Sequence, residues 1–162
     1  MKKEISALLN EQITKEFYSA YFYLAISAYY QEAGLTGFAS WYEVQAKEEE
    51  EHAMKIYGYL HDNGETVELG ALDAPKVSFS DFVEPVKAAL EHEEYITDAI
   101  NNIVAAAIKA NDYRTVSFLQ WFVDEQAEEE INANDMLQAV EFVQDDKAAF
   151  FSLNKSVGKR ND

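Results

Sequence analysis

The sequence of 162 residues contains no cysteine. Disulfides, zinc sites built from thiolates and iron–sulfur clusters held by cysteine are therefore excluded. A chain without cysteine is compatible with a reducing compartment, and we expect a cytoplasmic location. The N-terminal stretch MKKEISALLN has neither the apolar run nor the small-residue cleavage site of a secretory signal peptide.

Long apolar runs, helix breakers and basic residues are also scarce. No hydrophobic stretch approaches the roughly 20 residues that cross a bilayer, so we expect no membrane partner. The chain holds 6 glycines and 2 prolines, and breakers this rare favour long helices. Lys and Arg number 13 against 30 Asp and Glu, a net charge of −17. Such a chain repels nucleic acid and attracts cations.

Helical periodicity is present in four long segments and one short segment. The first ends before Gly34 and the second before Asn63, residue types that commonly follow a helix. Asp81 and Glu84 have the spacing of a capping box that opens the third. The expected helices cover about residues 3–32, 37–62, 81–111, 113–144 and 147–157.

The lengths of the connections predict the topology. Only a few residues join the first helix to the second and the third to the fourth, so each pair forms an antiparallel hairpin. Residues 65–80 join the two hairpins and span about 50 Å when extended, enough to run the length of a bundle. We therefore expect an all-α, single-domain chain over residues 1–162: a four-helix bundle (3–144) with one long crossover, then a short fifth C-terminal helix (147–157).

The apolar face of every long helix carries side chains able to bind a metal, near the middle of the helix. Burying ionised carboxylates costs several kcal/mol each, and a bound cation would offset that cost. From the first helix to the fourth, these side chains are Glu16; Glu49 and His52; Glu93; and Gln126 and Glu129.

The two hairpins repeat one spacing. In each hairpin, the first helix carries one acid, and the second helix carries two polar side chains that follow this acid by 33 and 36 residues. A two-fold arrangement of the hairpins brings all six side chains around one central site. Because the set is rich in oxygen and holds a single imidazole, it favours iron or manganese over zinc or copper.

Three stretches resemble bacterial non-haem ferritins: residues 10–23 (NEQITKEFYSAYFY), 48–54 (EEEEHAM) and 117–130 (SFLQWFVDEQAEEE). The similarity covers essentially the whole chain, including the tail helix. It implies a ferritin-like bundle that stores and detoxifies iron, with ferroxidase activity that oxidises Fe(II) with dioxygen or hydrogen peroxide. It also implies a homo-oligomeric shell of 24 subunits that holds ferric mineral.

The resemblance assigns roles at a di-iron centre. It implies that Glu16, Glu49 and His52 bind one iron and that Glu49 bridges to a second. The residues that it implies for the second iron are Glu93 and Glu129, with Gln126 beside them as a hydrogen-bonding neighbour.

The resemblance implies two further features around this centre. Glu48 and Glu125 match a third iron site, which shares Glu129 and has Glu128 nearby. Tyr23 matches a tyrosine close to the centre, where a packing role and a redox role both remain open.

Departures from neighbouring families exclude other cofactors. A bacterioferritin repeats Glu-x-x-His on the fourth helix, where this chain has Gln126 and Glu129. It also has a haem-ligating Met at the position of Glu50, so we expect no haem. A rubrerythrin needs cysteine pairs, and this chain has none.

Two other functions stay open: a small di-iron oxidase or peroxidase without mineral storage, and a cation-buffering bundle without turnover.

The other polar and aromatic residues near the centre have simpler interpretations. We expect solvated acids, surface histidines and packing tryptophans, with Glu128 and Glu130 undecided between an ordinary charged face and iron contact. The acids are Glu50 and Glu51, the histidines His61 and His92, and the tryptophans Trp41 and Trp121.

Overall fold

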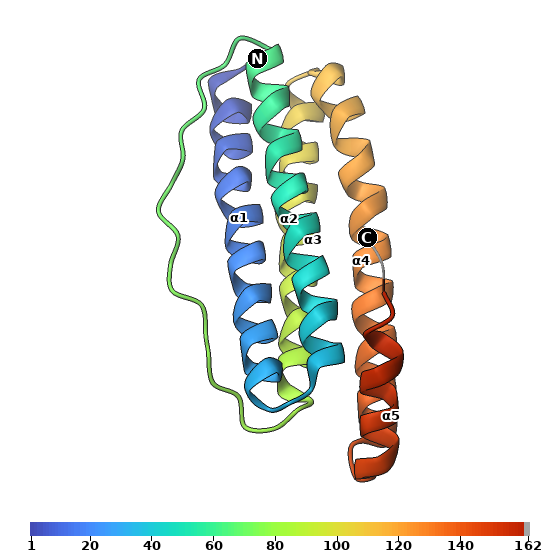
Figure 1. The fold of residues 1–162 in the computed structure, drawn as a ribbon. Coiled ribbons are helices and arrows are strands. Elements are labelled where there is room, and N and C mark those ends of the chain that lie inside the picture. The colour runs from blue at the N-terminus through green and yellow to red at the C-terminus, as the bar shows by residue number, and fades with distance from the viewer. Residues whose placement is uncertain (161–162) are drawn as a thin grey trace.

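The computed structural model describes residues 1–160 of the chain. This part contains five α-helices joined by turns and one long connection, and it contains no β-strand (Figure 1). The expected all-α class, a four-helix bundle with a short C-terminal helix, is confirmed. Within this range no helix combines the length and apolarity needed to cross a membrane. The helices are α1 (Lys3–Glu32), α2 (Thr36–Asp62), α3 (Glu84–Lys109), α4 (Tyr113–Val143) and α5 (Lys147–Val157).

A long crossover, residues 63–83, connects the two helical hairpins. It leaves the end of α2, runs down the outside of α1 and enters α3 at the opposite end of the bundle (Figure 1). Helix α1 holds it near both ends: the Asn10 amide donates to the Thr66 carbonyl at 3.0 Å, and the Tyr30 hydroxyl donates to the Phe82 carbonyl at 2.6 Å. The hairpins therefore pack with α2 parallel to α3, as one long crossover requires.

Helix α3 begins three residues later than expected. The Asp81 carboxylate accepts a hydrogen bond from the Glu84 N–H at 2.8 Å, while the Glu84 carboxylate accepts one from the Ser80 N–H. The Asp81 half of the expected capping box is therefore present, but Glu84 accepts from Ser80 and not from the Asp81 N–H, and the two side chains close a turn in front of the helix. Helix α2 begins one residue early, at Thr36.

The hydrophobic core consists of two clusters separated along the bundle. One contains residues such as Tyr30, Phe38 and Val140, towards the end where α5 packs. The other contains residues such as Leu9 and Ile100, towards the opposite end. Between them the inward positions of all four helices are polar, which places the expected metal-binding side chains at mid-length.

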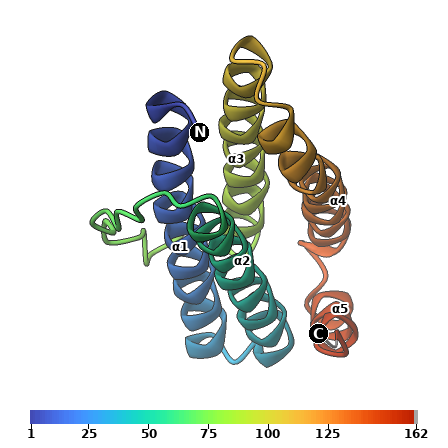
Figure 2. The ribbon, with the colours of Figure 1, turned by 90° about the horizontal axis from the view of Figure 1, so that it is seen from above.

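Helix α5 packs beside α2 and α4 (Figure 2). Its Asn154 side chain accepts hydrogen bonds from the Gly37 and Phe38 N–H groups at 2.9 and 3.1 Å, which caps the first turn of α2. A Cβ at Gly37 would lie 1.7 Å from the Asn154 carbonyl oxygen, so only glycine permits this approach. Phe150 and Val157 are buried in the core, so the chain itself covers the apolar edge of α5.

Candidate metal centre

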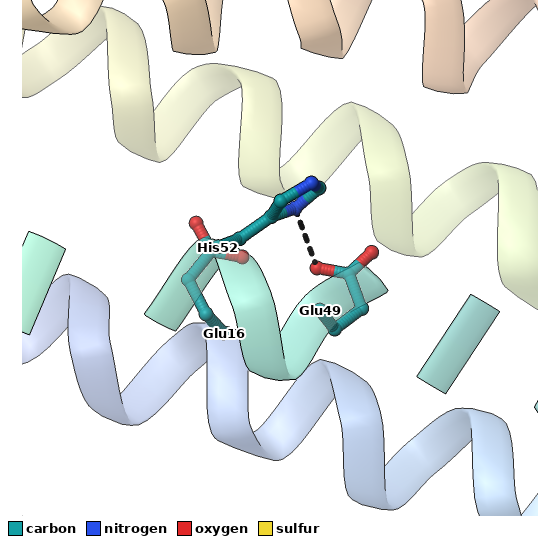
Figure 3. A group of neighbouring side chains, drawn as sticks. All are labelled: Glu16, Glu49 and His52. Atoms are coloured by element: carbon teal, nitrogen blue, oxygen red, sulfur yellow. Dashed lines mark hydrogen bonds and ion pairs between the residues drawn. The ribbon is translucent and has the colours of Figure 1, made fainter. Parts of the chain in front are cut away.

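All six inward polar side chains predicted at mid-bundle are buried and lie at one level. Each exposes between 1 and 6% of its surface. Glu16 projects from α1 towards Glu49 and His52, which lie one turn apart on α2 (Figure 3). The His52 Nδ1 atom is 3.2 Å from the Glu49 carboxylate. Glu93 comes from α3, and Gln126 and Glu129 come from α4.

The side-chain ligand atoms form three overlapping groups, in each of which they lie within 4.8 Å of one another. Glu49 belongs to two of the groups, which is the geometry that a bridging carboxylate needs. His52 and Glu129 also belong to two groups each. The groups are Glu16, Glu49 and His52; Glu49, Glu93 and Glu129; and His52, Glu125 and Glu129.

Two carboxylate oxygens at this level have no hydrogen-bond partner among residues 1–160. They are Oε2 of Glu16 and Oε1 of Glu49, and both are fully shielded from solvent. Buried acceptors are nearly always satisfied, and an unpaired one costs about 1–3 kcal/mol. A cation between these oxygens would satisfy both, so the residues present fit a metal ion.

The acids of the centre resist ionisation when no cation is bound. Burial, with a smaller contribution from the Glu49 charge, raises the pKa of Glu16 to about 8. Burial and the Glu93 charge raise the pKa of Glu129 to about 8, and burial raises the pKa of Glu93 to about 7. Burial also raises the pKa of Glu49 well above its usual range. A metal ion must therefore displace protons at neutral pH.

Three glutamine amides hold the carboxylates in place. A neutral amide fixes one oxygen of an acid without adding positive charge, so the remaining oxygens stay available to a cation. No role at the site is predicted from the sequence for Gln12 or Gln45, although Gln12 lies one turn before Glu16. The three bonds run from Gln12 to Glu16 at 2.9 Å, from Gln45 to Glu129 at 2.6 Å and from Gln126 to Glu93 at 3.1 Å.

Tyr23 lies against the centre, where its hydroxyl donates a hydrogen bond to the Glu93 carboxylate. The side chain is buried, and burial together with the Glu93 charge raises the pKa of this phenol. Tyr23 is therefore protonated, and its hydroxyl is a fixed donor to Glu93. This contact satisfies a core tyrosine and also places the ring beside the metal-binding groups.

His92, expected on the surface, is half-buried. Its ring packs 4.9 Å from the Phe22 ring, and its Nε2 atom is 2.7 Å from the Ser19 hydroxyl. Burial lowers the pKa of His92 to about 4, so the ring is neutral at ordinary pH. The aromatic side chains of α1 cover this position, and helical periodicity alone does not reveal such cover.

The remaining polar and aromatic positions mostly match their interpretations. His61, Glu50 and Glu51 are exposed, as is Glu128, whereas Glu130 is half-buried. Trp41 packs against the core, and Trp121 is partly exposed with its ring 5.3 Å from that of His52.

The two acids expected at a third iron site have different surroundings. The Glu125 carboxylate reaches the centre, with one oxygen 3.8 Å from the His52 Nε2 atom. Glu48 belongs to none of the three metal-capable groups found in residues 1–160. Its carboxylate instead pairs with Arg160 at 2.5 Å. Sequence reasoning missed Arg160 because it follows the last helix, where no periodicity places a side chain.

Comparison with known proteins gives one consistent result. A family model described as a ferritin-like domain matches residues 6–143. A bacterial non-heme ferritin of Staphylococcus epidermidis is 38% identical over 161 residues, covering 99% of this chain and 97% of that protein. One from Staphylococcus aureus (strain MRSA252) is 37% identical over 160 residues, with coverages of 99% and 96%. The solved structure of an open pore ferritin from the archaeon Archaeoglobus fulgidus superposes with a TM-score of 0.98 at 35% identity, covering 99% of both chains.

Proposed function

The chain belongs to the ferritin family and stores iron, and from this premise we propose that it oxidises Fe(II) at the centre of its bundle. The observation that carries the proposal is the sharing of Glu49 between two buried groups of ligand atoms. One iron would bind to Glu16, Glu49 and His52, and a second to Glu49, Glu93 and Glu129. Gln126 would hold Glu93 by a hydrogen bond, without binding metal itself.

Electron counting explains why a paired site suits this reaction. Two Fe(II) ions supply two electrons, which with two protons reduce dioxygen to hydrogen peroxide, or hydrogen peroxide to water. The acids of the centre contribute charge compensation, and they release protons as the cations bind. The glutamine amides contribute ligand geometry, and Tyr23 contributes a fixed hydrogen bond to Glu93.

We further propose a homo-oligomeric shell of 24 subunits, in the cytoplasm, with ferric mineral inside. Many large apolar side chains are exposed on the single chain, which is typical of surfaces that bury each other in an assembly. Carboxylates on an inner surface would attract Fe(III), and the net charge of −17 supplies them in excess. Among the exposed side chains, Leu24, Ile108 and Ile131 are between 45 and 60% exposed, and Phe142 is 93% exposed.

The size of the cavity at the centre argues against a small di-iron oxidase or peroxidase acting on an organic substrate. The cavity that reaches Glu93 and Glu129 measures about 20 Å³, room for about one water molecule. An organic substrate needs a pocket of several hundred Å³. An assay of Fe(II) oxidation distinguishes the cation-buffering alternative from the proposed function, because such a bundle would leave Fe(II) unoxidised.

Addition of Fe(II) in air is expected to give a fast absorbance phase that saturates at about two irons per subunit, because two groups of ligand atoms share Glu49. Stopped-flow titration measures this ratio. Saturation at one iron per subunit would contradict the bridging role of Glu49. Protein loaded with more iron should elute from a sizing column as a shell-sized, iron-rich particle, whereas a small oligomer would favour the oxidase alternative.

We also propose a third iron site formed by Glu48, Glu125 and the shared Glu129. The double change Glu48→Ala with Glu125→Ala is expected to raise the oxygen consumed per iron, because iron at the third site would supply electrons to the hydrogen peroxide formed at the centre, whose reduction to water takes two further electrons and two protons. The centre should also recover at a different rate before a second addition of Fe(II). An oxygen electrode and repeated additions measure both quantities.

The matched control for this double change is Glu50→Ala with Glu141→Ala, which removes two exposed acids from the same two helices. If both double variants consume oxygen and recover as the unmodified protein does, the third site loses its support.

A further inference from the structure

The side chain of Arg160, which follows α5, is held by several contacts with α2. Only 17% of its side chain is exposed. Its Nη2 atom donates to the Glu48 carboxylate at 2.5 Å, and its Nη1 atom donates to the Gln45 side-chain oxygen at 2.9 Å. The guanidinium also lies 4.4 Å from the centre of the Trp41 ring. Three specific contacts therefore act on this one side chain.

The docking of α5 on α2 brings Arg160 to this place. Asn154 caps the first turn of α2, and Val157 at the end of α5 is buried. A Cβ at Gly158 would lie 2.8 Å from the Gly37 Cα, so the end of α5 and the start of α2 are in close contact. Arg160 then reaches along α2 to the turns that carry Trp41, Gln45 and Glu48, on the side of the metal centre.

The same contacts connect Arg160 to the metal centre. The Gln45 side chain accepts from Arg160 with its oxygen and donates with its nitrogen to Glu129 at 2.6 Å. Glu129 belongs to two of the metal-capable groups, whereas Glu48 belongs to none. The guanidinium therefore occupies the place at the Glu48 carboxylate where a metal ion would bind. Only the Gln45 side chain connects it to Glu129.

We propose that Arg160 is a built-in counter-cation of Glu48, which a third metal ion has to displace before Glu48 can bind it. The inference rests on the proposed third site. A guanidinium and a metal ion both need the same carboxylate oxygens, and their charges repel at close range. The Glu48 side chain is 35% exposed, so an incoming ion can reach it. Arg160 thus weakens the third site in the resting protein and favours filling of the two central sites first.

Terbium(III) binding to the metal-free protein tests the inference without iron oxidation. Tryptophan-sensitised luminescence suits this site because the Trp41 ring lies beside Arg160. The binding phase lost in Glu48→Gln identifies the third site. Arg160→Gln is expected to tighten that phase about fivefold, as removal of a partly exposed ion pair predicts. Arg160→Lys keeps the charge and should retain most of the weakening.

The matched control is Lys159→Gln, which removes the same charge from the neighbouring, exposed position. It should leave the affinity of the phase near that of the unmodified protein. In the Glu48→Gln background, Arg160→Gln should change the remaining binding phases much less, because Arg160 reaches the central site only through Gln45. An unchanged affinity in Arg160→Gln, or an equal gain in Lys159→Gln, would overturn the inference. Loss of the proposed function would show itself differently, as absence of fast Fe(II) oxidation in the unmodified protein.

Discussion

Glu49→Gln is expected to slow the fast oxidation of Fe(II) by at least about a hundredfold, more than any other single change at the centre. Glu49 belongs to both central groups of ligand atoms, so its loss weakens both metal positions at once. Glu16 and His52 each belong to only one central group. Glu16→Ala or His52→Ala should therefore slow the phase about tenfold or more and still leave one metal position per subunit.

Two measurements separate these variants. Stopped-flow absorbance gives the rate of the fast phase, and calorimetric titration with Zn(II), which has no redox chemistry, gives the number of ions bound. Glu50→Gln is the matched control, since it makes the same chemical change at an exposed position next to Glu49. Neither rate nor stoichiometry should change in that control. If Glu49→Gln and Glu16→Ala lost the same number of ions, Glu49 would not bridge.

Much of the fold follows from two simple patterns in the sequence. Apolar residues at helical spacing define the helices, and scarce helix breakers define their ends. Each hairpin repeats the same interval between the acid of its first helix and the polar pair of its second, which places these side chains at mid-bundle. There the structure groups Glu49 with Glu16 on one side and with Glu93 on the other. These features are predictable because they depend on local periodicity and on hairpin geometry.

The features that sequence reasoning missed depend on contacts between distant segments. His92 has the periodicity of a surface residue, yet the aromatic side chains of α1 cover it. Asn154 caps a helix that begins more than a hundred residues earlier, and Arg160 pairs with Glu48 across a similar interval. Such partners follow from how α5 docks, and no short-range pattern in the sequence specifies that docking.

The metal-free protein is expected to become less stable as the pH rises from about 5 to about 8. In the unfolded chain the carboxyl groups of the centre have a pKa near 4.5, whereas in the folded chain the pKa is about 8 for Glu16 and Glu129 and about 7 for Glu93. The folded state therefore holds more protons across this interval, and the free energy of unfolding falls with pH. The stabilising contribution is complete below pH 4.5 and is lost as the pH passes 8.

Glu16→Gln tests this expectation because it replaces a buried acid with a neutral group of nearly the same shape. The variant should be more stable than the unmodified protein at pH 8, on the order of a few kcal/mol, and the difference should vanish near pH 5. Thermal unfolding of chelator-treated protein at both pH values measures the change. Saturating Zn(II) should stabilise the unmodified protein more than the variant, because the ion replaces the protons.

Glu51→Gln provides the control for overall charge. It removes one negative charge at an exposed position, so it reports how far the net charge of −17 alone destabilises the protein as the pH rises. If Glu51→Gln stabilised the protein at pH 8 as much as Glu16→Gln does, the effect would belong to general repulsion. A gain confined to Glu16→Gln would show that the buried acids destabilise the bundle until a cation binds, so that the residues proposed to bind iron are also those that lower its metal-free stability.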